Sequence, residues 1–275
     1  MGRVISQCEG KNFFFNHAIF EDPMGIFFDF HTHTTSEIIF LKNGSLSCIV
    51  GEKIYSLKKN DLIIFRANIP HKITFSDNAE YERYNILFDE KKMANKVFYK
   101  LPKELNVISC DGNTRLIELF DKMDLYCKML DEKDASVAVG NIVEEILFNI
   151  YLTPFDDMSR EHSTTHPLIS AAIEYINAHY KEPITVSDIS EHLFVTKSHL
   201  HHLFTQTMQI SPKRYINLKR ISKARQLILL GEKPYDVYIC CGFKDYTTFF
   251  RNYTMIFEHS PSEESGVVTE ESIKS

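Results

Sequence analysis

Residues 184–206 read "ITVSDISEHLFVTKSHLHHLFTQ", and this pattern predicts two short helices joined by a tight turn. Ile189 and Leu193 give the first helix an inner face, and the small Ser190 suits the point where two helices cross at an angle. The inner face of the second helix consists of Leu200, Leu203 and Phe204. Any pair of connected helices can show such a pattern, so the stretch indicates a helix-turn-helix unit only with support from elsewhere in the chain.

That support comes from residues 233–257, "KPYDVYICCGFKDYTTFFRNYTMIF", where the pattern recurs. They predict a short helix, a turn at Gly242 and a second helix. The inward-facing residues of that second helix are Phe249, Tyr253 and Phe257. The chain is therefore expected to contain two helix-turn-helix units.

Residues 211–230, "SPKRYINLKRISKARQLILL", lie between these units and predict one longer helix. Pro212 suits a helix start, and apolar residues recur at helical spacing. A helix of this length spans roughly 30 Å, and successive major-groove faces on one side of B-DNA lie roughly 34 Å apart. One chain can therefore present two recognition helices to adjacent major grooves.

Residues 166–264 resemble the DNA-binding domain of the AraC/XylS family of bacterial transcription regulators. The residues that carry the resemblance are "SP" at 211–212, Tyr215, Arg220, Ala224, Leu227, "GFKDYTTFFR" at 242–251 and "SPSE" at 260–263. The resemblance implies bipartite binding in two major grooves. The chain departs from the family pattern at Tyr238, where a small residue is usual, and at Gln209 and Glu258, where glycine is usual. His202 replaces a frequent arginine, so fewer phosphate contacts are expected.

The residues expected to contact DNA lie on the outward faces of the two recognition helices. They are Lys197, Ser198, His199, His201, His202 and Thr205 in the first unit, and Lys244, Thr247, Thr248, Arg251 and Asn252 in the second. Arg251 suits a guanine or a phosphate. The alternative is that Arg251 only pairs with Asp245 or with a neighbouring helix.

The first half of the chain predicts strands from about Phe13 to Phe88 and two helices between Thr114 and Leu152. Residues 38–50, "IIFLKNGSLSCIV", place Asn43-Gly44 between two apolar runs, which favours a hairpin. Short strands at this density predict a sandwich or a small barrel. The two helices either pack only on their own sheet or also meet a second subunit.

Residues 31–37, "HTHTTSE", carry the candidate binding residues of this half. His31, His33 and Glu37 share a face if they belong to one continuous strand, and His71 ends a later strand pair that can join them. With Gly25 and Gly44, this stretch resembles the first cupin motif, and His71 stands where the second motif supplies its histidine. Cupin-like domains of AraC/XylS regulators bind small effectors such as sugars.

Three interpretations of His31, His33, Glu37 and His71 stay open. The first is an effector pocket without metal, because convergent polar groups can hydrogen-bond a polyol. The second is a site for a divalent transition metal, since three imidazoles and a carboxylate suit Fe, Mn, Ni or Zn. The third is a set of structural core histidines.

The expected fold is multidomain α and β, with an N-terminal β-barrel or cupin-like domain with trailing helices and a C-terminal all-α bipartite helix-turn-helix domain. The expected segments are a cupin-like effector-sensing domain at 1–100, a helical dimerisation segment at 101–153, a linker at 154–165, the DNA-binding domain at 166–264 and a disordered tail at 265–275.

Composition agrees with a cytoplasmic globular protein of two domains. The chain has 275 residues, of which 44% are hydrophobic and 25% charged, and no segment long and apolar enough to cross a membrane is expected. Its six cysteines include no C-x-x-C pair, which indicates reduced packing residues. The net charge is −6, yet residues 166–261 carry 11 Lys and Arg against 8 Asp and Glu, which suits an anionic partner.

The sequence therefore predicts a DNA-binding transcription regulator whose N-terminal domain senses a small molecule. Its expected partners are double-stranded DNA, the effector, a second copy of the chain and, as a further candidate, RNA polymerase; no membrane partner and no cofactor are expected. The alternative is a metal-dependent cupin oxygenase or isomerase fused to a DNA-binding domain. We expect the chain not to be an enzyme.

Overall fold

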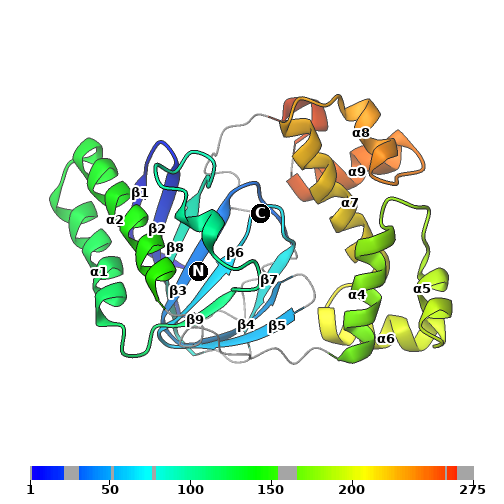
Figure 1. Cartoon of the computed structure of the whole chain (residues 1–275), viewed down its shortest axis with the longest axis horizontal. Helices are drawn as coiled ribbons and strands as arrows, with labels where there is room; N and C mark the ends of the chain where they lie inside the picture. Colours follow the sequence, from blue (N-terminus) through cyan, green and yellow to red (C-terminus); the bar gives the residue numbers. More distant parts are fainter. Residues whose placement is uncertain are drawn as a thin grey trace.

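The computed structural model describes residues 2–21, 31–50, 53–75, 79–153, 166–257 and 259–264. Figure 1 shows a strand-rich part flanked on one side by two helices and on the other by a purely helical part. We call residues 2–153 the N-terminal domain and residues 166–264 the C-terminal domain. The predicted linker at 154–165 and tail at 265–275 lie outside the described residues, as do Gly25 and Glu258.

The strands of the N-terminal domain form two antiparallel sheets. They are β1 (Arg3–Glu9), β2 (Phe13–Phe20), β3 (Ser36–Asn43), β4 (Ser45–Val50), β5 (Lys53–Lys58), β6 (Asp61–Phe65), β7 (His71–Thr74), β8 (Tyr81–Phe88) and β9 (Val107–Ser109). The larger sheet has the order β1-β2-β8-β3-β6-β9, and the smaller has the order β5-β4-β7.

Strand β3 shows how the layers of this domain are built. Successive side chains of a strand point to opposite faces. Ile38 and Phe40 pack with the helices that follow the strands, whereas Ile39 and Leu41 pack against the smaller sheet. All four side chains are buried, and each contributes about 2 kcal/mol of apolar burial. The larger sheet is therefore the middle layer between the helices and the smaller sheet.

The two sheets correspond to the sandwich form of the predicted fold, because among the described strands no hydrogen-bonded ladder joins them into a closed barrel. The predicted hairpin at Asn43-Gly44 is wrong, since β3 pairs with β6 and β8 while β4 pairs with β5 and β7. Gly44 instead turns the chain from one sheet to the other with φ of 92°, and a Cβ there would lie 2.6 Å from the carbonyl oxygen of Glu80.

The predicted helix pair is confirmed as α1 (Thr114–Met129) and α2 (Glu132–Leu152), after a 3-10 turn η2 (Val97–Lys100). Residues 101–153 are not wholly helical, because β9 pairs with β6 at the edge of the larger sheet. Contrary to expectation, α2 is long and apolar enough to cross a membrane by length and composition, with a mean hydropathy of 1.3. Its buried residues from Ala135 to Ile150 pack in the core of the N-terminal domain, which accounts for that composition.

The C-terminal domain is helical, as predicted. Its elements are α4 (Pro167–His179), α5 (Val186–His192), α6 (Lys197–Met208), α7 (Pro212–Leu229), α8 (Pro234–Cys240), α9 (Tyr246–Phe257) and the 3-10 turn η3 (Pro261–Glu263). One apolar core joins α4, α5, α6 and the first half of α7, and a second joins the rest of α7 to α8 and α9. Ile49 and Ile54 of the smaller sheet pack on the first of these cores, so the two domains are in contact.

Candidate DNA-reading helices and binding cluster

The first helix-turn-helix unit consists of α5 and α6, and its ends are defined by local hydrogen bonds. Thr185 and Asp188 form a capping box at the start of α5, and the side chain of Thr196 accepts a hydrogen bond from the backbone of His199 at the start of α6. Helix α6 ends at Gln209, which has the left-handed conformation with φ of 54°. This conformation explains why glycine is usual at that position.

The predicted DNA-contacting residues of α6 lie on its outer side. Lys197, Ser198, His199, His201 and His202 are exposed, and Thr205 is half-buried. The opposite side of α6 is fixed in the core by Leu200, Phe204 and Met208. The helix thus presents a polar face to solvent on a rigid support.

The second unit consists of α8 and α9, and it accommodates Tyr238 in an aromatic cluster. The ring of Tyr238 lies 5.5 Å from that of Tyr235, 5.7 Å from that of Tyr246 and 6.4 Å from that of Phe249, between ring centroids. These separations are typical of favourable aromatic pairs. Aromatic packing therefore replaces the small residue that is usual at this position.

The structure corrects one predicted DNA contact in α9. Lys244, Thr247 and Arg251 are exposed and Thr248 is half-buried, but Asn252 is buried. The side-chain amide of Asn252 donates to the carbonyl oxygen of Thr248 at 2.7 Å and its oxygen accepts from Asn217 at 3.3 Å. Asn252 therefore joins α9 to α7, and its buried side chain is not part of the exposed face of α9.

The two units are fixed relative to each other by the loop that follows α4. The buried guanidinium of Arg220 on α7 donates from Nε to the carbonyl oxygen of Tyr180 and from Nη2 to that of Glu182, both at 2.7 Å. A Cβ at Gly242 would lie 2.6 Å from the same Tyr180 oxygen and 2.7 Å from that of Lys181. Arg220 and Gly242 thus hold both units against one segment of backbone.

A hollow of about 410 Å³ separates the units on one side of α7. Its lining includes three lysines, Lys197 from α6, Lys213 from α7 and Lys244 from the turn before α9. Lys213 was not among the residues expected to contact DNA. In the sequence, only its place in the first turn of α7 could have indicated this role. Three ammonium groups around one hollow favour an anion there.

His31, His33, Glu37 and His71 come together in the N-terminal domain, and we call them the His31 cluster. His31 and His71 pair through two backbone hydrogen bonds of 3.1 and 3.0 Å. Residues 32–35 bend, so no continuous strand links His31 to Glu37. One ligand atom from each of the four residues lies within 4.8 Å of all the others. The predicted convergence is therefore present, although a bend and a strand pairing produce it.

Charge in the His31 cluster is concentrated on a buried carboxylate. Oε2 of Glu37 lies 3.1 Å from Nε2 of His33 and 3.4 Å from Nε2 of His71. Burial alone would raise the pKa of Glu37, but the two histidines outweigh it and hold this pKa well below its usual range. Burial lowers the pKa of His71 and so favours its neutral form.

The His31 cluster also touches the C-terminal domain. The buried hydroxyl of Ser222 on α7 donates to the carbonyl oxygen of Asn68 at 2.8 Å and lies 3.4 Å from the hydroxyl of Thr32. Thr32 stands between His31 and His33 in the chain, and the backbone N–H of Asn68 donates to the carbonyl oxygen of His33 at 2.8 Å. The helix that joins the two helix-turn-helix units therefore contacts Thr32 and Asn68, two residues beside the cluster.

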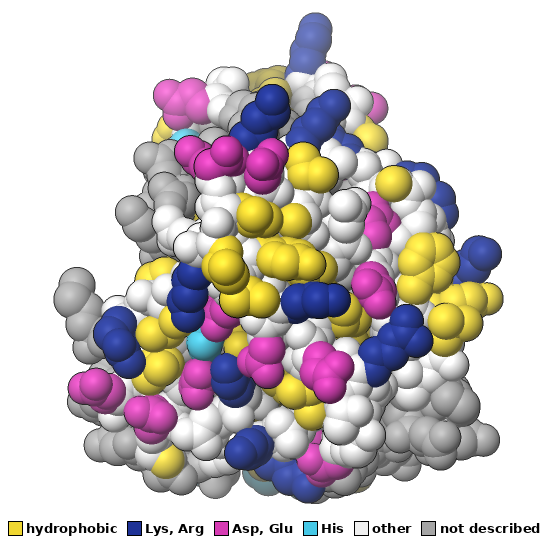
Figure 2. Space-filling view, turned by 90° about the vertical axis from the view of Figure 1, so that its left-hand side faces the viewer, with side chains coloured by type: hydrophobic (Ala, Val, Ile, Leu, Met, Phe, Trp, Pro, Cys, Tyr) yellow, Lys and Arg dark blue, Asp and Glu magenta, His cyan; other side chains and the backbone are white. Residues whose placement is uncertain are grey.

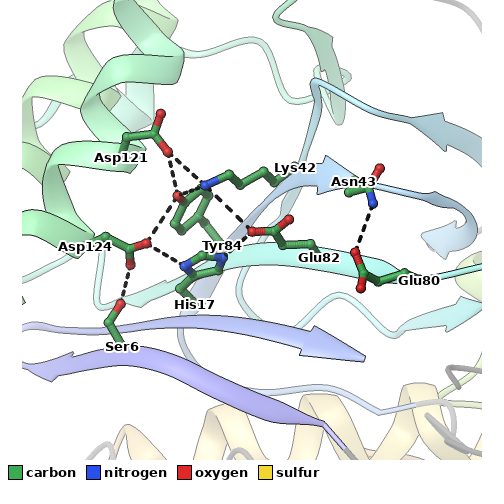
Figure 3. A network of polar contacts seen from close by, with 9 residues as sticks. All are labelled: Ser6, His17, Lys42, Asn43, Glu80, Glu82, Tyr84, Asp121 and Asp124. Carbon is green, nitrogen blue, oxygen red and sulfur yellow. Dashed lines mark hydrogen bonds and ion pairs between the residues drawn. The ribbon is translucent and has the colours of Figure 1, made fainter. Parts of the chain in front are cut away.

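A second buried polar group, which the sequence did not reveal, centres on His17. Figure 3 shows the His17 ring between Asp124 of α1, at 2.6 Å from Nδ1, and Glu82 of β8, at 2.9 Å from Nε2. Ser6 donates a hydrogen bond to Asp124. We call the set of Ser6, His17, Lys42, Glu82, Tyr84, Asp121 and Asp124 the His17 network. Its members come from five separate elements, so no sequence motif links them.

Comparison with known proteins identifies both halves of the chain. A model described as a helix-turn-helix domain matches residues 189–265, and a model described as an AraC-like ligand binding domain matches residues 17–95. The expected organisation, with a ligand-binding domain before the DNA-binding domain, is confirmed.

Relatives match nearly the whole chain. The probable transcriptional regulator LumQ of Photobacterium leiognathi is 33% identical over 243 residues, which cover 85% of this chain and 90% of LumQ. The lactose operon transcription activator of Staphylococcus xylosus is 23% identical, over 90% of this chain and 85% of its own. Among solved structures, ToxT from Vibrio cholerae O395 is 14% identical over 96% of this chain and 95% of its own, with a TM-score of 0.36. This chain belongs to the AraC/XylS family of transcription regulators and is a DNA-binding regulator with a domain that senses a small molecule.

Proposed function

We propose that α6 and α9 read successive major grooves of double-stranded DNA. The observation that carries this proposal is the position of the two polar helix faces at opposite ends of α7, with both units held by Arg220. Helix α7 has 18 residues and is about 27 Å long. The recognition helices pack on it at opposite ends, so the distance between them suits the roughly 34 Å between successive major grooves. Figure 1 shows α7 running between the α8–α9 pair and the α4–α6 group.

The contacts divide into those that position the protein and those that read bases. Lys197, Lys213 and Lys244 line the hollow between the units, where the phosphate backbone passes from one groove to the next. Arg251 and the exposed histidines of α6 face the grooves, and Arg251 is the candidate for a guanine. Hydrogen bonds from Thr248 lower the pKa of Asp245, and the positive charge of Arg251 lowers it further. Arg251 therefore lies near this carboxylate.

The His31 cluster is the proposed sensing site of the N-terminal domain. It combines buried polar groups with neighbouring residues, Thr32 and Asn68, that contact Ser222 of α7. A ligand that moves the backbone at Thr32 or Asn68 therefore changes the surface on which α7 rests. The name of the Staphylococcus xylosus relative keeps a sugar among the candidate effectors.

The proposed dimer forms through α1 and α2. Both helices bury one side against the larger sheet, and Figure 2, which views this end of the molecule, shows several hydrophobic patches between charged side chains. The large exposed apolar residues of the pair are Leu125, Met129, Leu130, Val137, Phe148, Tyr151 and Leu152. Apolar surface of this kind on a helix pair suits a second subunit. We further propose a cytoplasmic regulator without enzymatic activity that has RNA polymerase as a candidate partner.

Salt-dependent DNA binding by the full-length chain tests the proposal. A duplex selected from a random library by the full chain serves as the probe. We expect the affinity to fall steeply as salt rises, because each neutralised phosphate adds about 0.9 to the slope of log K against log salt. Arg251→Ala should weaken binding by about 1–3 kcal/mol and relax the selected sequence if Arg251 reads a base.

Lys58→Ala is the charge-matched control, because Lys58 is an exposed cation on β5, outside the proposed dimer interface, that pairs with Asp111. It should leave the affinity, the salt slope and the selected sequence unchanged. Weak, salt-independent binding by the wild-type chain, or equal effects of the two substitutions, would contradict the proposed DNA-reading surface.

A further inference from the structure

The histidines of the His31 cluster are oriented by main-chain carbonyl groups. Nδ1 of His33 lies 2.7 Å from the carbonyl oxygen of Thr35, and Nδ1 of His71 lies 2.9 Å from that of Ile69. A carbonyl oxygen only accepts, so Nδ1 carries the proton in both rings. In the neutral rings, each Nε2 then presents a lone pair, and both Nε2 atoms point to the carboxylate of Glu37.

When both rings are neutral, this arrangement has too many acceptors for one buried site. Nε2 of His71 is buried and makes no hydrogen bond to any residue that the structure describes, although it lies 3.4 Å from Oε2 of Glu37. A carboxylate has no proton to donate at neutral pH, so a lone pair faces a negative charge with water excluded. A proton on His33 would satisfy only one of the two nitrogens. A single cation between the rings and the carboxylate satisfies all three groups.

The two distances from Glu37 match those between neighbouring ligands of one transition-metal ion. An ion bound at about 2.1 Å by each ligand holds neighbouring ligand atoms about 3.0 Å apart in octahedral geometry and about 3.4 Å apart in tetrahedral geometry. The separations from Glu37 to His33 and His71 are 3.1 and 3.4 Å. All four ligand atoms lie within 4.8 Å of one another, so they surround one small space.

We propose that His31, His33, Glu37 and His71 bind one divalent first-row transition-metal ion, and that this ion controls the contact between the N-terminal domain and α7. The donor set of imidazole nitrogens and one carboxylate suits such ions. Hydrogen bonds from Nδ1 to carbonyl oxygens, which fix the ring orientation and the tautomer, are typical of histidines that bind metals.

The second part of the proposal follows from the backbone around the cluster. Ser222 contacts Thr32, which lies between two of the ligands, and Asn68, which lies three residues before His71. Asn68 has a φ of 65° and donates to the carbonyl oxygen of His33. An ion that draws His31, His33 and His71 to one centre therefore fixes both segments that Ser222 contacts. The proposal rests on the proposed regulatory function and names the ligand of its sensing site.

Metal binding is tested first, without DNA. The full-length protein is treated with a chelator, and Mn²⁺, Fe²⁺, Co²⁺, Ni²⁺ and Zn²⁺ are each titrated in by calorimetry, with the visible spectrum of Co²⁺ as a second readout. We expect one ion per chain for at least one metal. Glu37→Gln and His71→Gln should each weaken binding at least 10-fold, whereas His179→Gln, on the half-exposed His179 of α4, should not.

The thermal stability of each variant is measured alongside, so that loss of folding is not mistaken for loss of a ligand. Wild-type protein that binds none of the five ions stoichiometrically overturns the site. Binding that persists in both cluster variants overturns it as well.

The contact with α7 is tested by DNA affinity with and without metal. For the wild type we expect the bound ion to change the affinity for the selected duplex by about 5-fold or more, which is the lower end of typical allosteric coupling. The Ser222→Ala variant should still bind one ion, but its DNA affinity should no longer depend on the metal. Thr74→Val removes a comparable hydroxyl-to-carbonyl hydrogen bond inside the N-terminal domain, and the DNA affinity of this variant should still depend on the metal.

The outcomes separate this proposal from the proposed function. If metal binds but DNA affinity is the same with and without it, or if Ser222→Ala keeps the full response, control of the contact with α7 is wrong. If neither form binds the duplex, the DNA-reading function fails while the calorimetric result still decides the metal site.

Discussion

Two polar groups built around histidine lie in the N-terminal domain, and their hydrogen bonds are organised in opposite ways. In the His17 network, both ring nitrogens of His17 face carboxylate oxygens, at 2.6 Å from Asp124 and 2.9 Å from Glu82. In the His31 cluster, His33 and His71 use Nδ1 for main-chain carbonyls and share one carboxylate. In the first group, each ring nitrogen has its own carboxylate oxygen within hydrogen-bonding distance. In the second, Nε2 of His71 makes no hydrogen bond to a described residue.

This difference separates a histidine that joins two elements of the fold from histidines in the proposed ligand site. His17 joins α1 to the larger sheet, because Asp124 belongs to α1 and Glu82 to β8. A buried polar group stabilises a protein when all of its partners are present, and it costs free energy when one is missing. The two groups should therefore respond differently to the same kind of substitution.

The largest expected effect is that of His17→Gln on stability. The substitution leaves the mostly buried carboxylates of Asp124 and Glu82 without their shared partner. Leaving two mostly buried carboxylates without their hydrogen-bond partner costs about 3 kcal/mol or more. Urea unfolding followed by circular dichroism measures this cost, with His179→Gln as an exposed control expected near zero. A cost below about 1 kcal/mol for His17→Gln would mean that the network does not hold α1 to the sheet.

The next expectation compares two conservative carboxylate substitutions, Asp124→Asn and Glu37→Gln, in metal-free protein. Asp124→Asn removes an acceptor that His17 and Ser6 both use, so it should destabilise by about 2 kcal/mol. Glu37→Gln places an amide donor beside the lone pairs of His33 and His71, so its effect should stay within about 1 kcal/mol of zero. Equal costs in urea unfolding would show that the His31 cluster is as complete as the His17 network.

Sequence reasoning predicted the C-terminal domain well, because its information is local. The inner faces of both helix-turn-helix units appear as apolar residues at helical spacing, and Pro212 and Gly242 stand at their predicted boundaries. Asn252 was assigned wrongly because spacing alone does not show that a polar side chain bonds to the next helix. Arg220 was recognised from the motif, but its bonds to the loop at 180–182 are visible only in the structure.

The N-terminal domain was predicted less completely, because its contacts join distant segments. The four residues of the His31 cluster were identified, yet they meet through a bend and a pairing of His31 with His71. The hairpin at Gly44 failed because an Asn-Gly pair also suits a corner between two sheets. The His17 network and the contact of Ser222 with Asn68 involve residues separated by 65 to 154 positions, with no motif to connect them.

A third expectation concerns the pH range in which Asp124 stabilises the fold. Burial alone would raise its pKa, but hydrogen bonds from His17 and Ser6 outweigh burial and lower it. A carboxyl group with a lowered folded-state pKa stabilises the fold above its unfolded pKa, which is about 3.9 for Asp, and this stabilisation is lost as the pH falls through the folded value. The cost of Asp124→Asn should therefore be present at pH 5 and shrink below about pH 3.9. Urea unfolding of both proteins at pH 7, 5 and 3 measures it, and an undiminished cost at pH 3 would contradict the assignment.

The smallest expected effect comes from Tyr84→Phe at the edge of the His17 network. The Tyr84 hydroxyl accepts from Nζ of Lys42 at 2.7 Å and donates to Asp121 at 2.7 Å, while the ring stacks on Phe120 and is retained as Phe. Lys42 also reaches Asp121 directly at 3.0 Å, so neither partner is stranded and the loss should be about 1 kcal/mol. Urea unfolding with the exposed Tyr99→Phe as a control measures this difference. A cost near zero would mean that Lys42 and Asp121 satisfy each other without the hydroxyl. The part of the network that holds α1 to the sheet would then consist of His17, Ser6 and the two carboxylates that contact His17.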